Sequence, residues 1–149
     1  MKAMLHAIAG TLALMIVAAF LTSTLVSELL LEAADVVAVK TWIFYGIFAL
    51  IPLMAATGGL GVSLASGRTS PLIDRKKTRM KRIAANGLLI MLPAAVFLSF
   101  KASAGEFDAI FYIVQAVEIA GGFVQFALLK RNFADGLTMM AKRRMAIRD

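Results

Sequence analysis

Cysteine is absent from this sequence of 149 residues, and histidine occurs only once, at His6. The first absence excludes a disulfide framework and a thiolate metal site. A single histidine also excludes a multi-histidine metal site within one chain. A Ser-His-Asp triad would have to use His6, which lies inside a long apolar run. No paired carboxylates stand at catalytic spacing within a loop. We therefore predict a protein that is not an enzyme and that holds no metal ion.

Charged residues are also scarce, at 17% of the chain, whereas 60% of its residues are hydrophobic. A typical soluble domain is about 25% charged and about 45–50% apolar. The apolar excess forms four runs, each long enough to cross a hydrocarbon core about 30 Å thick. We predict spans over residues 3–26, 41–65, 83–100 and 107–129. The first run is too long for the apolar part of a signal peptide, so we expect it to be retained as a span.

Backbone polar groups must pair within each segment in lipid, so each span is predicted to be a helix. Short links make consecutive helices antiparallel neighbours. The predicted fold is thus an all-α integral membrane protein, an antiparallel four-transmembrane-helix bundle that forms a single membrane domain over residues 1–149. No segment outside the spans is long enough to bury a core of its own.

The basic residues predict the orientation of this bundle. Residues 68–82 form a basic loop between the second and third spans, and residues 130–149 form a basic tail. Of sixteen Lys and Arg residues, only Lys40 and Lys101 fall on the opposite side. Because lysine and arginine accumulate on the cytoplasmic side, both termini are predicted to be cytoplasmic. The pattern favours a multi-pass protein of the bacterial inner (plasma) membrane. We expect the tail to form either an amphipathic helix on the membrane surface or a frayed, solvated segment.

The net charge of +7 is explained by this topology, so we expect no binding to nucleic acid. Beyond anchoring the topology, the basic loop is a candidate for docking anionic lipid headgroups or an acidic partner loop, at about 1 kcal/mol per basic residue near the surface. The residues concerned are Arg75, Lys76, Lys77, Arg79, Lys81 and Arg82.

The fourth span carries a polar stripe, because Asp108, Gln115, Glu118 and Gln125 share one face at helical spacing. Such a stripe is expected to face the bundle interior or a partner chain. Glu118 is predicted near the bilayer midplane, where an acid costs about 2.5–3.5 kcal/mol on insertion scales. One interpretation is a proton- or cation-exchanging site. The other is a protonated acid hydrogen-bonded to Thr57 or to the backbone freed by Pro93.

Counting depth along the helices places His6 level with Asn86 and Gln125, which predicts a polar cluster near the cytoplasmic face. His6 is a candidate axial ligand for a b-type haem, although a second ligand would have to come from a methionine or another chain. The alternative is a histidine bonded within the bundle or to headgroups, with no cofactor. In the second span, Ala55, Gly59 and Ser63 form a ladder of small residues that predicts close helix packing within the chain or in a homodimer.

Three functional hypotheses follow. The first is a non-enzymatic accessory or assembly subunit, bound to other membrane-protein subunits, because the polar stripe has few obvious partners within the chain. The second is a small proton-coupled transporter that uses Glu118. The third is a b-type haem electron-transfer protein that uses His6.

Overall fold

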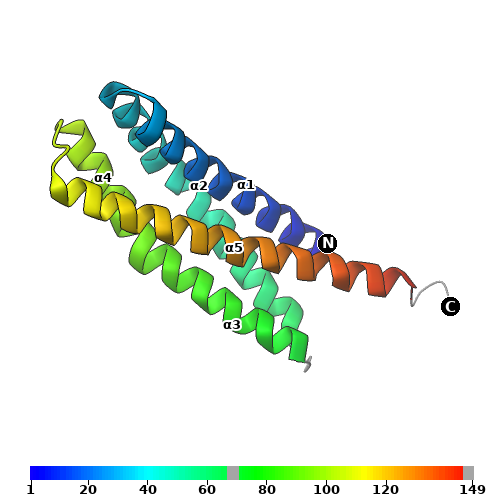
Figure 1. The fold of residues 1–149 in the computed structure, drawn as a ribbon. Coiled ribbons are helices and arrows are strands. Elements are labelled where there is room, and N and C mark those ends of the chain that lie inside the picture. Colours follow the sequence, from blue (N-terminus) through cyan, green and yellow to red (C-terminus); the bar gives the residue numbers. More distant parts are fainter. Residues whose placement is uncertain (67–70, 146–149) are drawn as a thin grey trace.

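A computed structural model describes residues 1–66 and 71–145, without the side chains of Leu72 and residues 139–145. Its elements are the α-helices α1 (Lys2–Leu30), α2 (Ala33–Ala65), α3 (Pro71–Asn86), α4 (Leu92–Ser103) and α5 (Ala109–Met145), and the π-helix η1 (Gly87–Met91). The segments α3, η1 and α4 follow one another without a break, so they form a single long rod (Figure 1). The described chain is therefore all-helical, with four rods.

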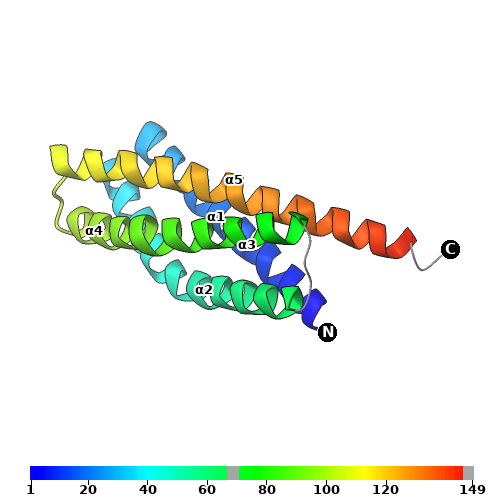
Figure 2. The same cartoon turned by 90° about the horizontal axis from the view of Figure 1, so that it is seen from below.

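The four rods run antiparallel to their neighbours in sequence (Figures 1 and 2). The N-terminus, the end of α2, the start of α3 and the end of α5 lie at one end, which we call the basic end. The α1–α2 and α4–α5 connections lie at the other end, which we call the acidic end. Helix α1 packs against α2 and α5, and α4 packs against the same two helices. All four rods are long and apolar enough to cross a membrane.

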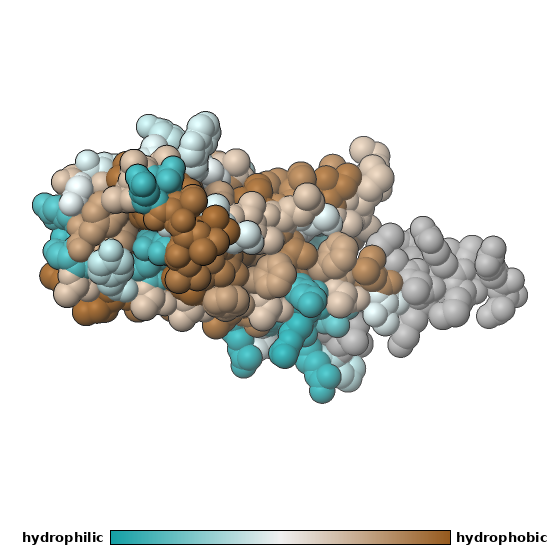
Figure 3. All heavy atoms as spheres, turned by 45° about the horizontal axis from the view of Figure 1, so that its top comes forward, coloured by the Kyte–Doolittle hydropathy of each residue, from teal (hydrophilic) through white to brown (hydrophobic). Residues whose placement is uncertain are grey.

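The outside of the bundle is apolar over much of its length, and hydrophilic residues gather toward the two ends (Figure 3). Large hydrophobic side chains such as Trp42, Phe48 and Ile113 are largely exposed. Between the rods, three small apolar clusters lie at successive levels of the bundle. Because so much apolar surface lies outside, this chain has the composition of a protein whose surroundings are lipid.

The second helix begins eight residues earlier than predicted, at Ala33 rather than near Thr41. Glu32 caps it: the backbone N–H of Glu32 donates to the Asp35 carboxylate at 3.3 Å, within a reciprocal capping box. The acidic link therefore contains only two residues, 31 and 32. As a result Lys40, which sequence reasoning placed at the membrane surface, lies inside a helix.

The basic segment 68–82 was predicted to be a loop, and this is wrong for the part that the structure describes. Residues 71–82 are helical and belong to α3; residues 68–70 lie outside the described part. Pro71 begins the helix, where its missing N–H breaks no intrahelical bond. The Lys, Arg and Met residues that follow are good helix formers, so the basic side chains belong to the continuous third rod.

The tail also differs from the prediction. Helix α5 continues to Met145, so residues 130–145 extend the fourth helix rather than form a separate surface helix or an irregular tail. Residues 146–149 lie outside the described part.

Close packing uses other glycines than the predicted ladder. Ala55, Gly59 and Ser63 are all exposed, and a Cβ added at Gly59 would meet nothing within 4 Å. In contrast, a Cβ at Gly46 would lie 2.5 Å from the Phe20 ring, and one at Gly121 would lie 2.8 Å from the Met91 sulfur. The ladder therefore makes no close helix contact within the chain, although Oγ of Ser63 accepts a hydrogen bond from Lys2 at 3.4 Å. The closest approaches are made at Gly46, Gly61 and Gly121.

Candidate functional site

A buried ion pair joins α2 to α5. The Nζ of Lys40 lies 2.5 Å from Oε2 of Glu118, and the two residues are only 1% and 5% exposed. The same carboxylate oxygen accepts a hydrogen bond from Nε2 of Gln115 at 3.1 Å. The acid of the fourth span is thus held between an ammonium and an amide, inside the chain.

The polar stripe of the fourth span faces the bundle over most of its length. Gln115, Glu118 and Gln125 are all buried, as their spacing predicted. Asp108 is exposed at the acidic end, where its Oδ1 accepts from the backbone N–H of Phe111 and caps α5. The hydrogen bond from Lys101, together with that backbone bond, lowers the pKa of Asp108.

A second acid approaches the ion pair from α1. Glu28 is partly buried, and its Oε1 is fully covered without a hydrogen-bond partner. It lies close enough to Lys40 and Glu118 to interact with the charges of both. The site therefore comprises the Lys40–Glu118 ion pair and a neighbouring carboxyl group, Glu28, which forms no ion pair with Lys40. We call these three residues, drawn from α1, α2 and α5, the triad.

Sequence reasoning missed two members of this triad, Lys40 and Glu28. Both were assigned to the link between the first two spans, outside the membrane. The signal was present in the acidic residues Glu32 and Asp35, whose spacing is that of a helix N-terminus. Starting the helix there carries Lys40 two turns inward, onto the face that Glu118 meets.

Thr57 was predicted to lie beside Glu118, and the structure places it elsewhere. Its Oγ1 donates to the carbonyl of Leu53 in its own helix at 2.7 Å. Its backbone carbonyl oxygen instead lies 3.0 Å from Nδ1 of His6. Thr57 therefore holds His6 on α1 and makes no bond to the acid.

The predicted cluster of His6, Asn86 and Gln125 forms only in part. Nδ2 of Asn86 donates to Oε1 of Gln125 at 2.8 Å and to the carbonyl of Gly121 at 2.9 Å. His6 is not a member: its Nδ1 lies 3.0 Å from the backbone carbonyl oxygen of Thr57, and it shares no hydrogen bond with Asn86 or Gln125. Counting residues along the helices placed His6, Asn86 and Gln125 at the same depth, but such counting does not show which helices are neighbours.

The six basic docking candidates divide into two groups on α3. Arg75, Lys77, Lys81 and Arg82 are exposed and point away from the bundle. Lys76 and Arg79 are partly buried toward α5, and Arg79 forms an ion pair with Asp135 at 2.6 Å. Arg79 thus joins α3 to α5, whereas the four exposed residues remain available to meet headgroups or a partner.

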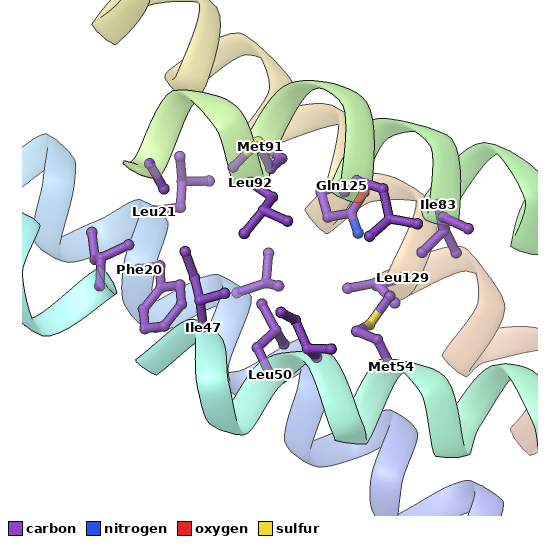
Figure 4. Close-up of a pocket in the computed structure, with 18 of the residues that line it drawn as sticks. Phe20, Leu21, Ile47, Leu50, Met54, Ile83, Met91, Leu92, Gln125 and Leu129 are labelled. Carbon is purple, nitrogen blue, oxygen red and sulfur yellow. The ribbon is translucent and has the colours of Figure 1, made fainter. Parts of the chain in front are cut away.

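A cavity of about 370 Å³ lies between the rods (Figure 4). Figure 4 shows the side chains of α2 on one side and of the rod of α3, η1 and α4 on the other pointing into it, among them Ile47, Leu50, Met54, Ile83 and Leu92. Its polar lining residues are Thr24, Thr57, Glu118, Gln125 and Asn132. The cavity is therefore mostly apolar, and Glu118 of the triad forms part of its wall.

The π-helix η1 lies at this cavity and ends two residues before Pro93, which belongs to the first turn of α4. Proline has no N–H to donate to the carbonyl four residues earlier, at Leu89. A π-helical turn is a common accommodation within a helix and often occurs at functional sites. Gly87, Leu88 and Met91 of η1 all line the cavity.

Among the residues that the structure describes, no three acidic or histidine side chains gather closely enough to hold a metal ion. His6 is not among the residues that line the cavity. Comparisons with protein-family models, with curated proteins and with solved structures find no match to this chain. The site is accordingly interpreted from its own geometry.

Proposed function

We propose that this protein is a small proton-coupled transporter of the bacterial inner membrane, with both termini in the cytoplasm. The observation that carries the proposal is the Lys40–Glu118 ion pair, because its carboxylate also lines a largely apolar cavity. Ionisable groups within a membrane bundle commonly mark ion or substrate pathways. Here the Glu118 carboxylate both pairs with Lys40 and borders the space that a substrate would occupy.

Charge counting explains how the site would respond to protons. Glu28, Lys40 and Glu118 together carry one net negative charge when both acids are ionised. When one of the two acids binds an additional proton, the net charge of the triad becomes zero, which is favourable in surroundings of low polarity. The triad is therefore a one-proton site that cycles between a charged and a neutral state.

The proposed switch follows from the two acids around Lys40. A proton that binds the Glu118 carboxylate converts it to a neutral acid and removes its attraction for the ammonium. The side chain of Lys40 then turns toward Glu28, whose covered oxygen has no hydrogen-bond partner. Because the three residues belong to α1, α2 and α5, this exchange alters the packing of helices that enclose the cavity.

Proteoliposomes with an imposed pH gradient test this proposal, using a fluorescent long-chain alkylamine as the transported probe. We expect gradient-driven flux in the wild type, its loss in Glu118→Gln, and a strong reduction in Lys40→Met. Glu106→Gln is the matched control, because this acid is exposed and pairs with Lys101 at the acidic end. Flux through Glu118→Gln equal to that of the wild type would show that the pair is structural, and would refute the proposal.

The orientation is tested on the same chain, which offers a natural cysteine-free background. Lys77→Cys and Glu106→Cys place single thiols at the basic and acidic ends. We expect a membrane-impermeant maleimide to label the second from outside intact cells, and the first only after permeabilisation. The reverse pattern would invert the proposed topology.

A non-enzymatic subunit of a larger complex is the second candidate. The polar stripe no longer argues for this candidate, because Glu118 and Gln125 have partners within the chain. The exposed ladder of Ala55, Gly59 and Ser63 now favours it instead, since small residues admit a close partner helix. Companions that co-purify at fixed ratio from native membranes, and are lost in Gly59→Leu, would support this candidate over transport.

The haem hypothesis rests on His6 alone. The contact of its Nδ1 with the Thr57 carbonyl leaves Nε2 as the only ring nitrogen for iron. An absorbance spectrum of protein expressed with added haem tests it, and a missing Soret band would exclude it.

A further inference from the structure

The cavity opens sideways, between α2 and the segment of α3 and η1. Four of its lining residues are apolar and exposed: Ile51 and Ala55 on α2, Ala84 on α3 and Leu88 on η1. Ile51 and Leu88 are 44% and 58% exposed. Figure 4 looks into the cavity between these helices, and α2 and α3 contact each other only sparsely. The mouth therefore lies on the apolar flank of the bundle rather than at a water-facing end.

The cavity is long and narrow. It is lined by Glu118 and by Asn132, which lie fourteen residues apart on α5, or about 21 Å at the helical rise of about 1.5 Å per residue. Its volume of about 370 Å³ is near the lower limit for small-molecule pockets, about 300 Å³. A helix, about 10 Å across, is too wide for this space. A single extended hydrocarbon chain has the matching shape and polarity.

One polar group in the wall lacks a partner. Asn132 is 8% exposed and lines the cavity near the basic end, and its Oδ1 is fully covered without a hydrogen bond. Buried amide oxygens are nearly always paired in native proteins, so an unpaired one in a cavity wall indicates a missing donor. The other polar groups deep in the wall already have partners: Glu118 bonds Lys40 and Gln125 bonds Asn86.

From these observations we propose that the cavity binds a single-chain membrane amphiphile. Its hydrocarbon chain enters from the bilayer between α2 and α3–η1. Its head group donates a hydrogen bond to Oδ1 of Asn132, whose side chain turns to bring this covered oxygen into the cavity. This assigns the substrate class of the transport cavity, and in that respect it rests on the proposed function. Binding itself requires neither a proton nor Glu118 in a particular state.

Photolabelling of the full-length protein in nanodiscs tests the inference. The probes are a long-chain alcohol with a diazirine midway along its chain and the methyl ether of the same alcohol, which lacks the hydroxyl donor. We expect saturable labelling of cavity residues such as Met54 and Ile83, with the alcohol bound about 2- to 10-fold more tightly than the ether, as one hydrogen bond predicts. Non-saturable labelling confined to outward residues such as Trp42 would overturn the inference.

Paired variants separate the mouth from the general surface. Ala55→Trp fills the rim, whereas Ala56→Trp places the same residue one position on, exposed but outside the cavity lining. We expect the first to reduce cavity labelling at least about tenfold and the second to leave it unchanged. Equal labelling in both would refute entry between α2 and α3–η1.

A second pair tests the polar end. Asn132→Leu should bind the alcohol no better than the ether, yet fold as stably as the wild type, because it removes an oxygen without a partner. Asn86→Leu should destabilise the fold, because it breaks two bonds. An alcohol preference that survives in Asn132→Leu would overturn the assigned contact. Saturable binding without proton-driven flux would sustain this inference while refuting transport, and flux without cavity labelling would do the reverse.

Discussion

Replacing Lys40 by methionine should destabilise the bundle by about 3–5 kcal/mol, the usual consequence of removing one partner from a buried ion pair. At 2.5 Å and an effective dielectric constant of about 20, the gross attraction between the two charges is about 6–7 kcal/mol. Much of that is spent on desolvating groups that are 1% and 5% exposed. The single substitution leaves the Glu118 carboxylate with Gln115 as its hydrogen-bond donor.

The double variant should behave differently. Lys40→Met combined with Glu118→Leu removes both charges together, and similar replacements of buried pairs are neutral or stabilising by about 1–4 kcal/mol. The expected coupling energy between the two positions is therefore at least about 3 kcal/mol. Unfolding in mixed micelles of mild detergent and dodecyl sulfate measures it, followed by helical circular dichroism and by the fluorescence of Trp42, the only tryptophan.

The partly exposed pair Arg79–Asp135 provides the control cycle, with an expected coupling of less than about 1 kcal/mol. If the two single variants at Lys40 and Glu118 each cost less than about 1 kcal/mol and add without coupling, water reaches the pair. The reasoning from burial would then be refuted.

Two further predictions concern packing and pH. Gly121→Ala should destabilise the fold by about 1–2 kcal/mol in the same unfolding assay, because its Cβ would lie 2.8 Å from the Met91 sulfur. Gly59→Ala is the control: with open space around it, this change should be neutral or stabilise the fold by up to about 1 kcal/mol. Equal effects of the two substitutions would contradict the packing described. The lowered pKa of Asp108, caused first by the hydrogen bond from Lys101, means that this acid contributes stability above its unfolded value of about 3.9 and loses it as the pH falls through the lower folded pKa. Unfolding midpoints measured from pH 6 to pH 2 should therefore fall less steeply in Asp108→Asn than in the wild type, and parallel curves would show that the bond is not formed.

Helix ends show where local reading of the sequence failed. A change from apolar to charged residues was taken as the end of a helix, which is sound only when the charged residues leave the helix. In this chain Pro71 and the basic residues after it begin a helix, and Glu32 and Asp35 cap another. Apolar length fixes how much of a helix lies in lipid, whereas capping and propensity fix where it begins and ends.

The candidate site shows a different limit. The periodicity of α5 correctly predicted that Gln115, Glu118 and Gln125 are buried, because a polar stripe on an apolar helix cannot face lipid at low cost. Counting depth along the helices also placed Asn86 level with Gln125, and the two are hydrogen-bonded. It did not pair Glu118 with Lys40, because a lysine at the predicted edge of a span has an ordinary role at the membrane surface.

The sequence alone determined the helical class, the four rods and the inward face of α5, because each depends on short-range periodicity and on the length of apolar runs. Only the tertiary structure decided which rods are neighbours: α1 meets α2 and α5, which brings Glu28 to Lys40 and Glu118 and keeps His6 from Asn86. It also decided that α2 and α3 contact each other only sparsely and leave a cavity with a lateral mouth. Depth along a helix is encoded by counting residues, whereas the partners across a bundle depend on how all the side chains pack at once.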